Sequence, residues 1–160
     1  MGNSVIATAQ LAIGYRNYSK GKFEQAVHCY RKAAKRGSAV AQYNLGDCYK
    51  HGNGVKQDFS LAAEWYRKAA EQGNAIAQFT LGVCYATGKG VGQSFELSAE
   101  WLRKAAEQGL AEAQNCLGGC YEKGGGVEQD FSLAAEWYRK AAEQGDVGAK
   151  SNLERLKALD

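Results

Sequence analysis

The residues best suited to chemistry in this sequence are its five cysteines and two histidines. Thiolates and imidazoles are the usual protein ligands of zinc, and the two groups can also pair as nucleophile and base. Cys48, Cys84 and Cys120 recur every 36 residues, so they occupy one position of a repeated unit. Stacked helical pairs place such equivalents about 20 Å apart, whereas a disulfide needs Cα atoms within about 7 Å. We therefore expect these three thiols to stay unbridged and to pack as small buried apolar side chains.

A metal centre or a catalytic dyad is not indicated either. Cys116 and Cys120 lie four residues apart and offer two ligands on one helix face, but a structural zinc site needs four. The histidines, His28 and His51, lie in other units. His28 and Cys29 are adjacent, so on a helix their side chains diverge by about 100°. We expect no catalytic residue, no metal and no cofactor.

The composition argues against several other classes. Charged residues make up 23% of the 160-residue chain and the formal net charge is +3, which is too small and too dispersed for a nucleic-acid-binding surface. No stretch has the length and apolarity needed to cross a bilayer, and residues 1–10 lack the basic start and apolar run of a signal peptide. We expect no nucleic-acid partner, no membrane insertion and a cytoplasmic location.

The elements that carry these residues repeat along the chain. The block at residues 59–73 recurs letter for letter at 131–145, and a near copy stands at 95–109. Tryptophan, glycine and tyrosine recur at the same interval of 36 residues. A fixed period of this length is typical of one structural unit stacked on its neighbours.

A single unit, residues 39–74, reads as two helices. Ala41, Leu45 and Cys48 share one face of a first helix, and glycines follow it where the chain must reverse. Asp58 stands where its side chain can cap the second helix. That helix carries an apolar stripe formed by Phe59, Ala62, Ala63, Tyr66, Ala69 and Ala70. The sequence predicts an antiparallel helical hairpin and an all-α fold.

Gly46, Gly82 and Gly118 recur inside the predicted first helices, where glycine costs roughly 1 kcal/mol relative to alanine. The simplest explanation is that the second helix crosses here too closely for a Cβ atom. The alanines of residues 68–70 are the expected neighbours of this glycine. We interpret the three glycines as packing residues and not as ligand contacts.

The two ends of the array differ from its middle. Residues 7–38 match the unit only if four residues of the turn are deleted, so the first hairpin is shorter. Residues 147–160 fit one more first helix, with Glu154 and Lys157 at the glycine and tyrosine positions. Charges at packing positions are typical of a solvent-facing cap. We expect one domain, residues 1–160, of about nine helices: four hairpins and a capping helix.

The repeat resembles the Sel1-like repeat, a relative of the tetratricopeptide repeat with a longer turn. The residues that carry the resemblance are Ala41-Gln-x-x-Leu-Gly-x-x-Tyr49, Gly52-x-Gly-Val55 and Ala62-x-x-Trp65-Tyr-x-Lys-Ala-Ala70. Three stretches fit in full: residues 39–74, 75–110 and 111–146. Residues 7–38 are nearer the tetratricopeptide form and carry Asn17 where tyrosine is expected. The resemblance implies a right-handed α/α solenoid whose first helices line a concave face, in proteins that act as adaptors and assembly scaffolds.

Under this resemblance, aligning the first helices on their Leu-Gly pair identifies the concave residues. They differ between units, whereas the other helix faces are nearly copied. The first two units supply Thr8, Leu11, Tyr15 and Tyr18, then Val40, Tyr43, Asp47 and Lys50. The next two supply Ile76, Phe79, Val83 and Ala86, then Glu112, Asn115, Gly119 and Glu122. An aromatic strip, of a kind that marks interaction sites, is expected from Tyr15, Tyr18, Tyr43 and Phe79.

We therefore predict a non-enzymatic adaptor that binds another protein or a peptide on its concave face. The ligand is expected to bring an apolar anchor to the first three units and basic residues to Glu112 and Glu122. The alternative role of the aromatic residues is to bridge adjacent first helices as packing. Apolar residues near the start, Val5 and Ile6, also leave a homodimer through the solenoid ends open.

Two other classes remain as alternatives. Some secreted cysteine-rich relatives are linked to β-lactam binding, which implies a ligand-binding or hydrolase-like protein; they carry two cysteines per hairpin, whereas most units here carry one. An engineered or idealised scaffold without a native ligand is suggested by the perfect fifteen-residue copy and the absence of proline. Counting reactive thiols separates the secreted class from an intracellular adaptor.

Overall fold

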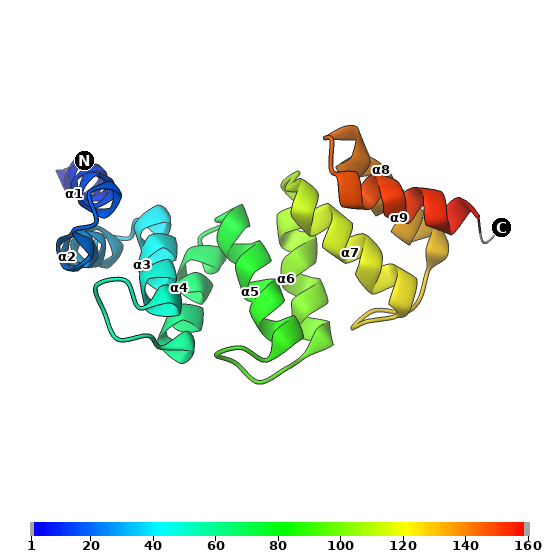
Figure 1. The fold of residues 1–160 in the computed structure, drawn as a ribbon, viewed down its shortest axis with the longest axis horizontal. Helices are drawn as coiled ribbons and strands as arrows, with labels where there is room; N and C mark the ends of the chain where they lie inside the picture. The colour runs from blue at the N-terminus through cyan, green and yellow to red at the C-terminus, as the bar shows by residue number, and fades with distance from the viewer. Residues whose placement is uncertain (1, 159–160) are drawn as a thin grey trace. The chain divides into compact units, whose positions relative to one another are not determined.

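The computed structural model describes residues 2–158, and all regular secondary structure in this range is α-helical. The nine helices of the described range are α1 (Gly2–Ser19), α2 (Phe23–Lys35), α3 (Ala39–His51), α4 (Phe59–Glu71), α5 (Ala75–Thr87), α6 (Phe95–Glu107), α7 (Ala111–Lys123), α8 (Phe131–Glu143) and α9 (Val147–Lys157) (Figure 1). The predicted all-α class and the helix count are confirmed. The predicted cap forms as α9, and the last two residues predicted for it lie outside the described range.

The helices gather into two compact units. The first, unit 1, holds the chain up to Ala77 together with Lys89–Val91, and the second, unit 2, holds Gln78–Gly88 and the chain from Gly92 onward. Helices that follow one another pack together within them, as α3 packs on α4 and α7 on α8. Each unit has its own core, with a buried cluster around Tyr30 and Leu45 in unit 1.

The turns inside the hairpins form as their residue types predict. Gly52 ends α3 in the left-handed region, with φ 73°, and Gly124 does the same after α7, with φ 69°. The Asp58 carboxylate accepts a hydrogen bond of 2.9 Å from the Leu61 backbone N–H and caps α4. Matching caps begin α6 and α8 at Ser94 and Asp130. Each hairpin therefore positions its first helix by local interactions that its own sequence specifies.

The helical glycine marks a close crossing, as predicted, but its neighbour is not an alanine. A Cβ atom on Gly46 would lie 2.7 Å from the ring of Tyr66 and 3.1 Å from the Ala62 carbonyl oxygen. Gly82 and Gly118 meet Leu102 and Tyr138 in the same way. The prediction that residues 68–70 face this glycine was wrong, because the space that it leaves holds a large buried side chain one turn earlier in the second helix.

Two details of the expected core also differ. Phe59 at the start of the predicted stripe is partly buried, whereas its equivalents Phe95 and Phe131 in the later hairpins remain about half exposed. Cys48 is fully buried as expected, whereas Cys84 and Cys120 are only partly buried. The cysteine position therefore belongs to the core in the second hairpin but lies at its margin in the later ones.

Buried glutamines join successive hairpins. Gln42 of α3 donates to the Ala34 carbonyl of α2 and accepts a hydrogen bond of 2.6 Å from Gln72. Gln114 repeats this arrangement with Ala106 and Gln144. Because both ends of the side-chain amide are satisfied, a polar residue is stable in the core at each of these junctions.

Candidate interaction surface

Three of the predicted concave residues line one small pocket in unit 1. The pocket has a volume of about 130 Å³ and is bounded by Tyr15, Tyr18, Tyr30, Asn44 and Asp47. These residues come from α1, α2 and α3. Two neighbouring hairpins thus build the pocket between them, and we refer to these five residues as the tyrosine–aspartate pocket.

The rings of this pocket are held by edge-to-face contacts. The ring centroids of Tyr15 and Tyr30 lie 5.9 Å apart at 75°, and those of Tyr18 and Phe23 lie 5.0 Å apart at 70°. The Tyr18 hydroxyl accepts a hydrogen bond of 2.7 Å from the Asn53 side chain. Tyr15 nevertheless remains 47% exposed. The aromatic wall is therefore preformed and open to solvent on one side.

The polar wall of the pocket comes from α3. The hydroxyl of Tyr66 donates a hydrogen bond of 2.6 Å to the Asp47 carboxylate. The ring centroids of Tyr66 and Tyr43 lie 5.5 Å apart. The Asn44 amide nitrogen is buried and has no hydrogen-bond partner among the described residues. A buried donor without an acceptor is uncommon in folded proteins and calls for a physical account.

The other predicted residues of unit 1 lie outside this pocket. Leu11 is half buried and packs against the core. The side chain of Thr8 bonds to the Ser4 carbonyl. Exposed or partly exposed positions on the same helices and on the start of α5 are Val40, Lys50 and Ile76.

The predicted aromatic strip is divided between the two units. Phe79 belongs to unit 2, where it packs against a cluster that includes Ala105 and Leu117. This contact is the packing role that the sequence left open for the aromatic residues. Tyr18 packs in the same way against the core of unit 1, so the exposed part of the aromatic strip rests mainly on Tyr15.

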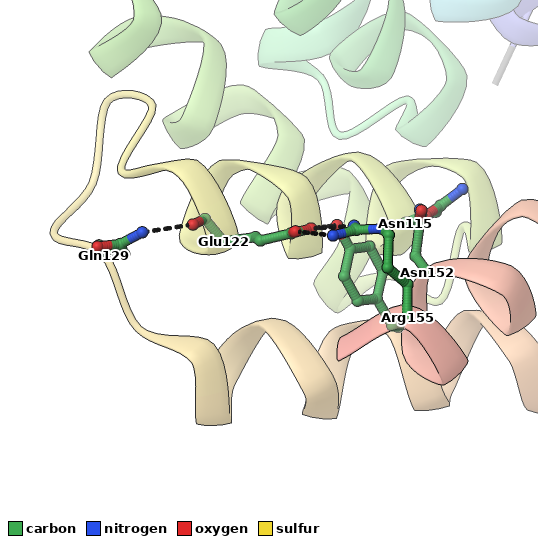
Figure 2. A network of polar contacts seen from close by, with 6 residues as sticks. Asn115, Glu122, Gln129, Asn152 and Arg155 are labelled. Carbon is green, nitrogen blue, oxygen red and sulfur yellow. Dashed lines mark hydrogen bonds and ion pairs between the residues drawn. The ribbon is translucent and has the colours of Figure 1, made fainter. Parts of the chain in front are cut away.

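The predicted acidic end is partly occupied by the chain itself. The Arg155 guanidinium of α9 forms two hydrogen bonds with the Glu122 carboxylate, of 2.5 and 2.8 Å, and the Tyr138 hydroxyl donates a third over 2.7 Å (Figure 2). The guanidinium holds the pKa of Glu122 below its usual value. Asn115 on the same helix bonds to Asn152 of α9. Glu112 remains exposed.

An apolar pocket of about 300 Å³ lies in unit 2. Leu102, which lines it, occupies the repeat position of Tyr66 and Tyr138 in the flanking hairpins. Its lining includes Val83, Ala86, Phe95, Leu102, Cys116, Gly119, Cys120 and Lys123. Desolvation raises the pKa of the Cys116 and Cys120 thiols, so their surroundings do not favour the thiolate form. The lining of this pocket suits apolar contact.

Sequence reasoning missed four residues of these sites. Tyr30, Asn44 and Tyr66 complete the unit 1 pocket and its support, and Arg155 fills the acidic site of unit 2. One signal was available: Leu102 interrupts an otherwise repeated tyrosine, so that position varies with its surroundings. Arg155 also aligns with Asp47 when α9 is placed in the repeat register.

The described residues hold neither a cluster of metal ligands nor a membrane-spanning helix. No group of three or more histidine, cysteine, aspartate or glutamate side chains in that range is arranged to hold a metal ion. None of the helices within it combines the length and apolarity needed to span a membrane.

Comparisons with known proteins agree on the repeat. The Sel1 repeat model matches residues 7–38, 39–74, 75–110 and 111–146. Among solved structures, the chain is similar to c5321, a protective antigen of uropathogenic Escherichia coli, with 44% identity, a TM-score of 0.86, and coverage of 89% of this chain and 32% of that one. It is also similar to a Sel1 repeat protein from Oxalobacter formigenes, with 39% identity, a TM-score of 0.87, and coverage of 92% of this chain and 62% of that one.

A second kind of relative is a much longer protein. The rat protein DAP3-binding cell death enhancer 1 is 40% identical over 53 residues, which are 33% of this chain and 10% of the relative. The chain thus spans about a tenth of that protein and about a third of the E. coli antigen.

Proposed function

Because the chain belongs to the Sel1 repeat family, whose members are generally non-catalytic protein-interaction modules, we propose that it binds a partner protein through the exposed face of its first helices. The binding face in unit 1 centres on Tyr15, Tyr18, Tyr43 and Asp47. The partner is a protein or a peptide segment in an extended or helical form. The name of the rat relative states that it binds DAP3, which is consistent with protein binding by this class of repeat.

The observation that carries the proposal is a preformed and accessible aromatic wall. Tyr15 is 47% exposed and lines a pocket with Tyr18 and Asp47. Tyrosine is among the residue types enriched at the few positions that carry most of the binding energy of protein interfaces. These residues lie at helix positions whose residue type differs from repeat to repeat, whereas the buried positions are nearly identical in all repeats. A surface that varies on a constant scaffold is suited to one particular ligand.

Affinity capture from a native lysate tests the proposal. The comparison is between the wild-type chain, a Tyr15→Ala/Tyr43→Ala variant and the control Phe131→Ala, which removes a ring that is 50% exposed on a second helix. Circular dichroism verifies the helicity of each variant. We expect a protein that wild type and control retain and the double variant loses. Equal retention by the double variant contradicts the proposed face.

Self-association is a second candidate, favoured by an exposed apolar row on α1. Ile6 and Ile13 are 45% and 47% exposed, and their spacing of seven residues places them on one helix face. Such a row is suited to pairing with a second copy. Sedimentation equilibrium of the wild type and of Ile6→Glu/Ile13→Glu measures it: a dimer lost in the variant supports pairing, and a monomeric wild type contradicts it.

We also propose that the protein is cytoplasmic and not secreted. The redox state of its cysteines distinguishes the two locations. Within the described residues no cysteine takes part in a disulfide. We expect a thiol reagent to label all five cysteines of the unfolded chain without prior reduction. Fewer labelled thiols before reduction than after it would favour the secreted class.

A further inference from the structure

The chain contains one carboxylate site that already holds a guanidinium. In unit 2, the Glu122 carboxylate accepts a hydrogen bond from the Tyr138 hydroxyl. It also accepts two hydrogen bonds from the Arg155 guanidinium of α9 (Figure 2). The paired geometry is the fork that planar guanidinium and carboxylate groups form with each other. The fold therefore builds, within its own sequence, a tyrosine-supported acidic site for an arginine side chain.

Unit 1 has a carboxylate with the same tyrosine donor and without that cation, although from another position of the repeat, since Asp47 matches Gly119 and Glu122 matches Lys50. Tyr66 and Tyr138 occupy the same position of the repeat, and both are buried. Tyr66 donates to Asp47 over 2.6 Å, as Tyr138 donates to Glu122 over 2.7 Å. Among the described residues, no lysine, arginine or histidine forms an ion pair with Asp47. The carboxylate keeps the capacity for further donors, because each of its oxygens can accept more than one hydrogen bond.

The surroundings of Asp47 favour a planar cation. Tyr15, Tyr18 and Tyr30 bound the tyrosine–aspartate pocket, and aromatic faces attract cations electrostatically. The pocket volume of about 130 Å³ is close to the roughly 150 Å³ of a cavity that accommodates benzene, so it fits one side-chain head group and not a larger ligand.

The pocket also offers a donor that a cation alone would not satisfy. The buried Asn44 amide nitrogen lacks an acceptor among the described residues. A peptide supplies both kinds of group, because the N–H donors of its side chain reach the carboxylate and a backbone carbonyl accepts from Asn44. A free inorganic cation has no such acceptor.

We propose that the tyrosine–aspartate pocket binds the guanidinium of an arginine side chain in the partner, with Asp47 as its carboxylate and the tyrosine rings as its walls. The proposal rests on the function proposed above and specifies what the partner must carry. Arginine is preferred to lysine because its planar fork pairs with a carboxylate and stacks on aromatic rings. Specificity for one basic residue would then be set by α1, α2 and α3 together.

A titration followed by nuclear magnetic resonance tests the proposal without the partner. The probe is N-acetyl-arginine methylamide at low salt, and its matched neutral analogue is N-acetyl-citrulline methylamide, which replaces the guanidinium by a urea of similar shape. The proteins are the full wild-type chain, Asp47→Asn and Asp47→Val. The valine is the residue that the third repeat has at this position, Val83. Asp58→Ser is the charge control, because it removes one carboxylate from unit 1 and keeps the cap type that α6 uses at Ser94.

We expect saturable shifts of the Asn44 side-chain amide and the Tyr15 and Tyr30 rings with the arginine probe in wild type and Asp58→Ser. Both Asp47 variants and the citrulline probe should bind at least about tenfold more weakly, as a lost hydrogen bond to a charged group implies. Equal binding of the two probes, unchanged affinity in the Asp47 variants, or no saturable shift in the wild type would each overturn the proposal.

The same variants separate this proposal from the proposed function. If the arginine probe fails to bind while partner capture still depends on Tyr15 and Tyr43, only the cation pocket is wrong. If the probe binds at Asp47 while capture is insensitive to both tyrosines, the pocket stands and the proposed partner-binding face fails.

Discussion

Tyr66, Leu102 and Tyr138 occupy one position of three successive hairpins, and the difference between them is a single hydroxyl-bearing ring. Both tyrosines reach a carboxylate on the preceding first helix. Leu102 has no hydroxyl, and its hairpin carries Val83 in place of Asp47 and borders an apolar pocket instead. A tyrosine bonded to a carboxylate is thus found in the second and fourth hairpins, and leucine beside an apolar pocket in the third.

The glycine beside this position is predicted to be indispensable for packing. In Gly46→Ala the new Cβ atom would lie 2.7 Å from the buried Tyr66 ring and 3.1 Å from the Ala62 backbone oxygen, which cannot move aside easily. Overpacking costs about 1–3 kcal/mol and outweighs a gain of roughly 1 kcal/mol in helix propensity. We expect a net loss in the free energy of unfolding, measured by urea denaturation.

Gly119→Ala is the matched control, because Gly119 also lies inside a first helix and its new Cβ atom would lie 3.5 Å from the Tyr138 hydroxyl, an ordinary contact distance. A Gly46→Ala protein as stable as this control would show that the crossing is not tight.

The ion pair of α9 predicts a pH dependence with a defined sign. Arg155 holds the pKa of Glu122 below its ordinary value of 4.5, so the folded state binds this proton less tightly than the unfolded chain does. The pair therefore stabilises the fold above pH 4.5, and the contribution is lost as the pH falls from there through the folded pKa. The stability difference between wild type and Glu122→Gln should be positive at neutral pH and shrink in acid.

Urea denaturation across that pH range measures the difference, with Glu112→Gln as the control for removing one charge from α7. A difference between wild type and Glu122→Gln that grows as the pH falls would contradict the role given to the ion pair.

Each hairpin keeps the same helices and turn, and its site differs from that of its neighbours at a few side chains. Installing Tyr66 and Asp47 of the second hairpin at the matching positions of the third gives Leu102→Tyr and Val83→Asp. Gly82 faces residue 102 as Gly46 faces Tyr66, so the ring has room. The single Leu102→Tyr change leaves its hydroxyl without a carboxylate, and the double change supplies one.

We expect a favourable coupling energy of about 1 kcal/mol between these two substitutions in a double-mutant cycle of unfolding free energies. Strictly additive effects would mean that the tyrosine–carboxylate pair of the second hairpin cannot be transplanted. The cycle therefore tests whether the pair is a property of the hairpin alone.

The elements were predictable from sequence because their signals are local. Helical periodicity, the positive-φ glycines and the cap at Asp58 lie within one hairpin, and each formed where expected. The pocket was less predictable, because its walls meet across α1, α2 and α3. The alignment of first helices brought Tyr15, Tyr18 and Asp47 into the prediction, whereas Tyr30 comes from a second helix that the alignment did not consider.

The site in unit 2 was also hard to predict, because its residues come from helices of different repeats. The sequence predicted that Glu122 binds a basic residue of the partner, but that basic residue is Arg155 of the chain's own α9. A sequence aligned by repeat does not show which side chains of neighbouring repeats touch. Arg155 was therefore assigned to a solvent-facing cap when it also neutralises a carboxylate.

At the scale of the whole molecule, two compact units present different surfaces. Unit 1 offers an open aromatic pocket with an acidic residue, and unit 2 offers an apolar pocket and an acidic residue that is already paired. We assign recognition of the partner to the first-helix face and a structural role to the second helices. This division between helix faces is the central claim.

Site-specific photo-crosslinking tests this claim most directly. A benzophenone amino acid replaces Thr8 or Val40 on first helices, and His28 or Glu64 on the exposed face of second helices of the same unit. We predict that one protein is crosslinked from the first two positions and not from the other two. Crosslinking of that protein from His28 or Glu64, with none from Thr8 and Val40, would contradict this assignment.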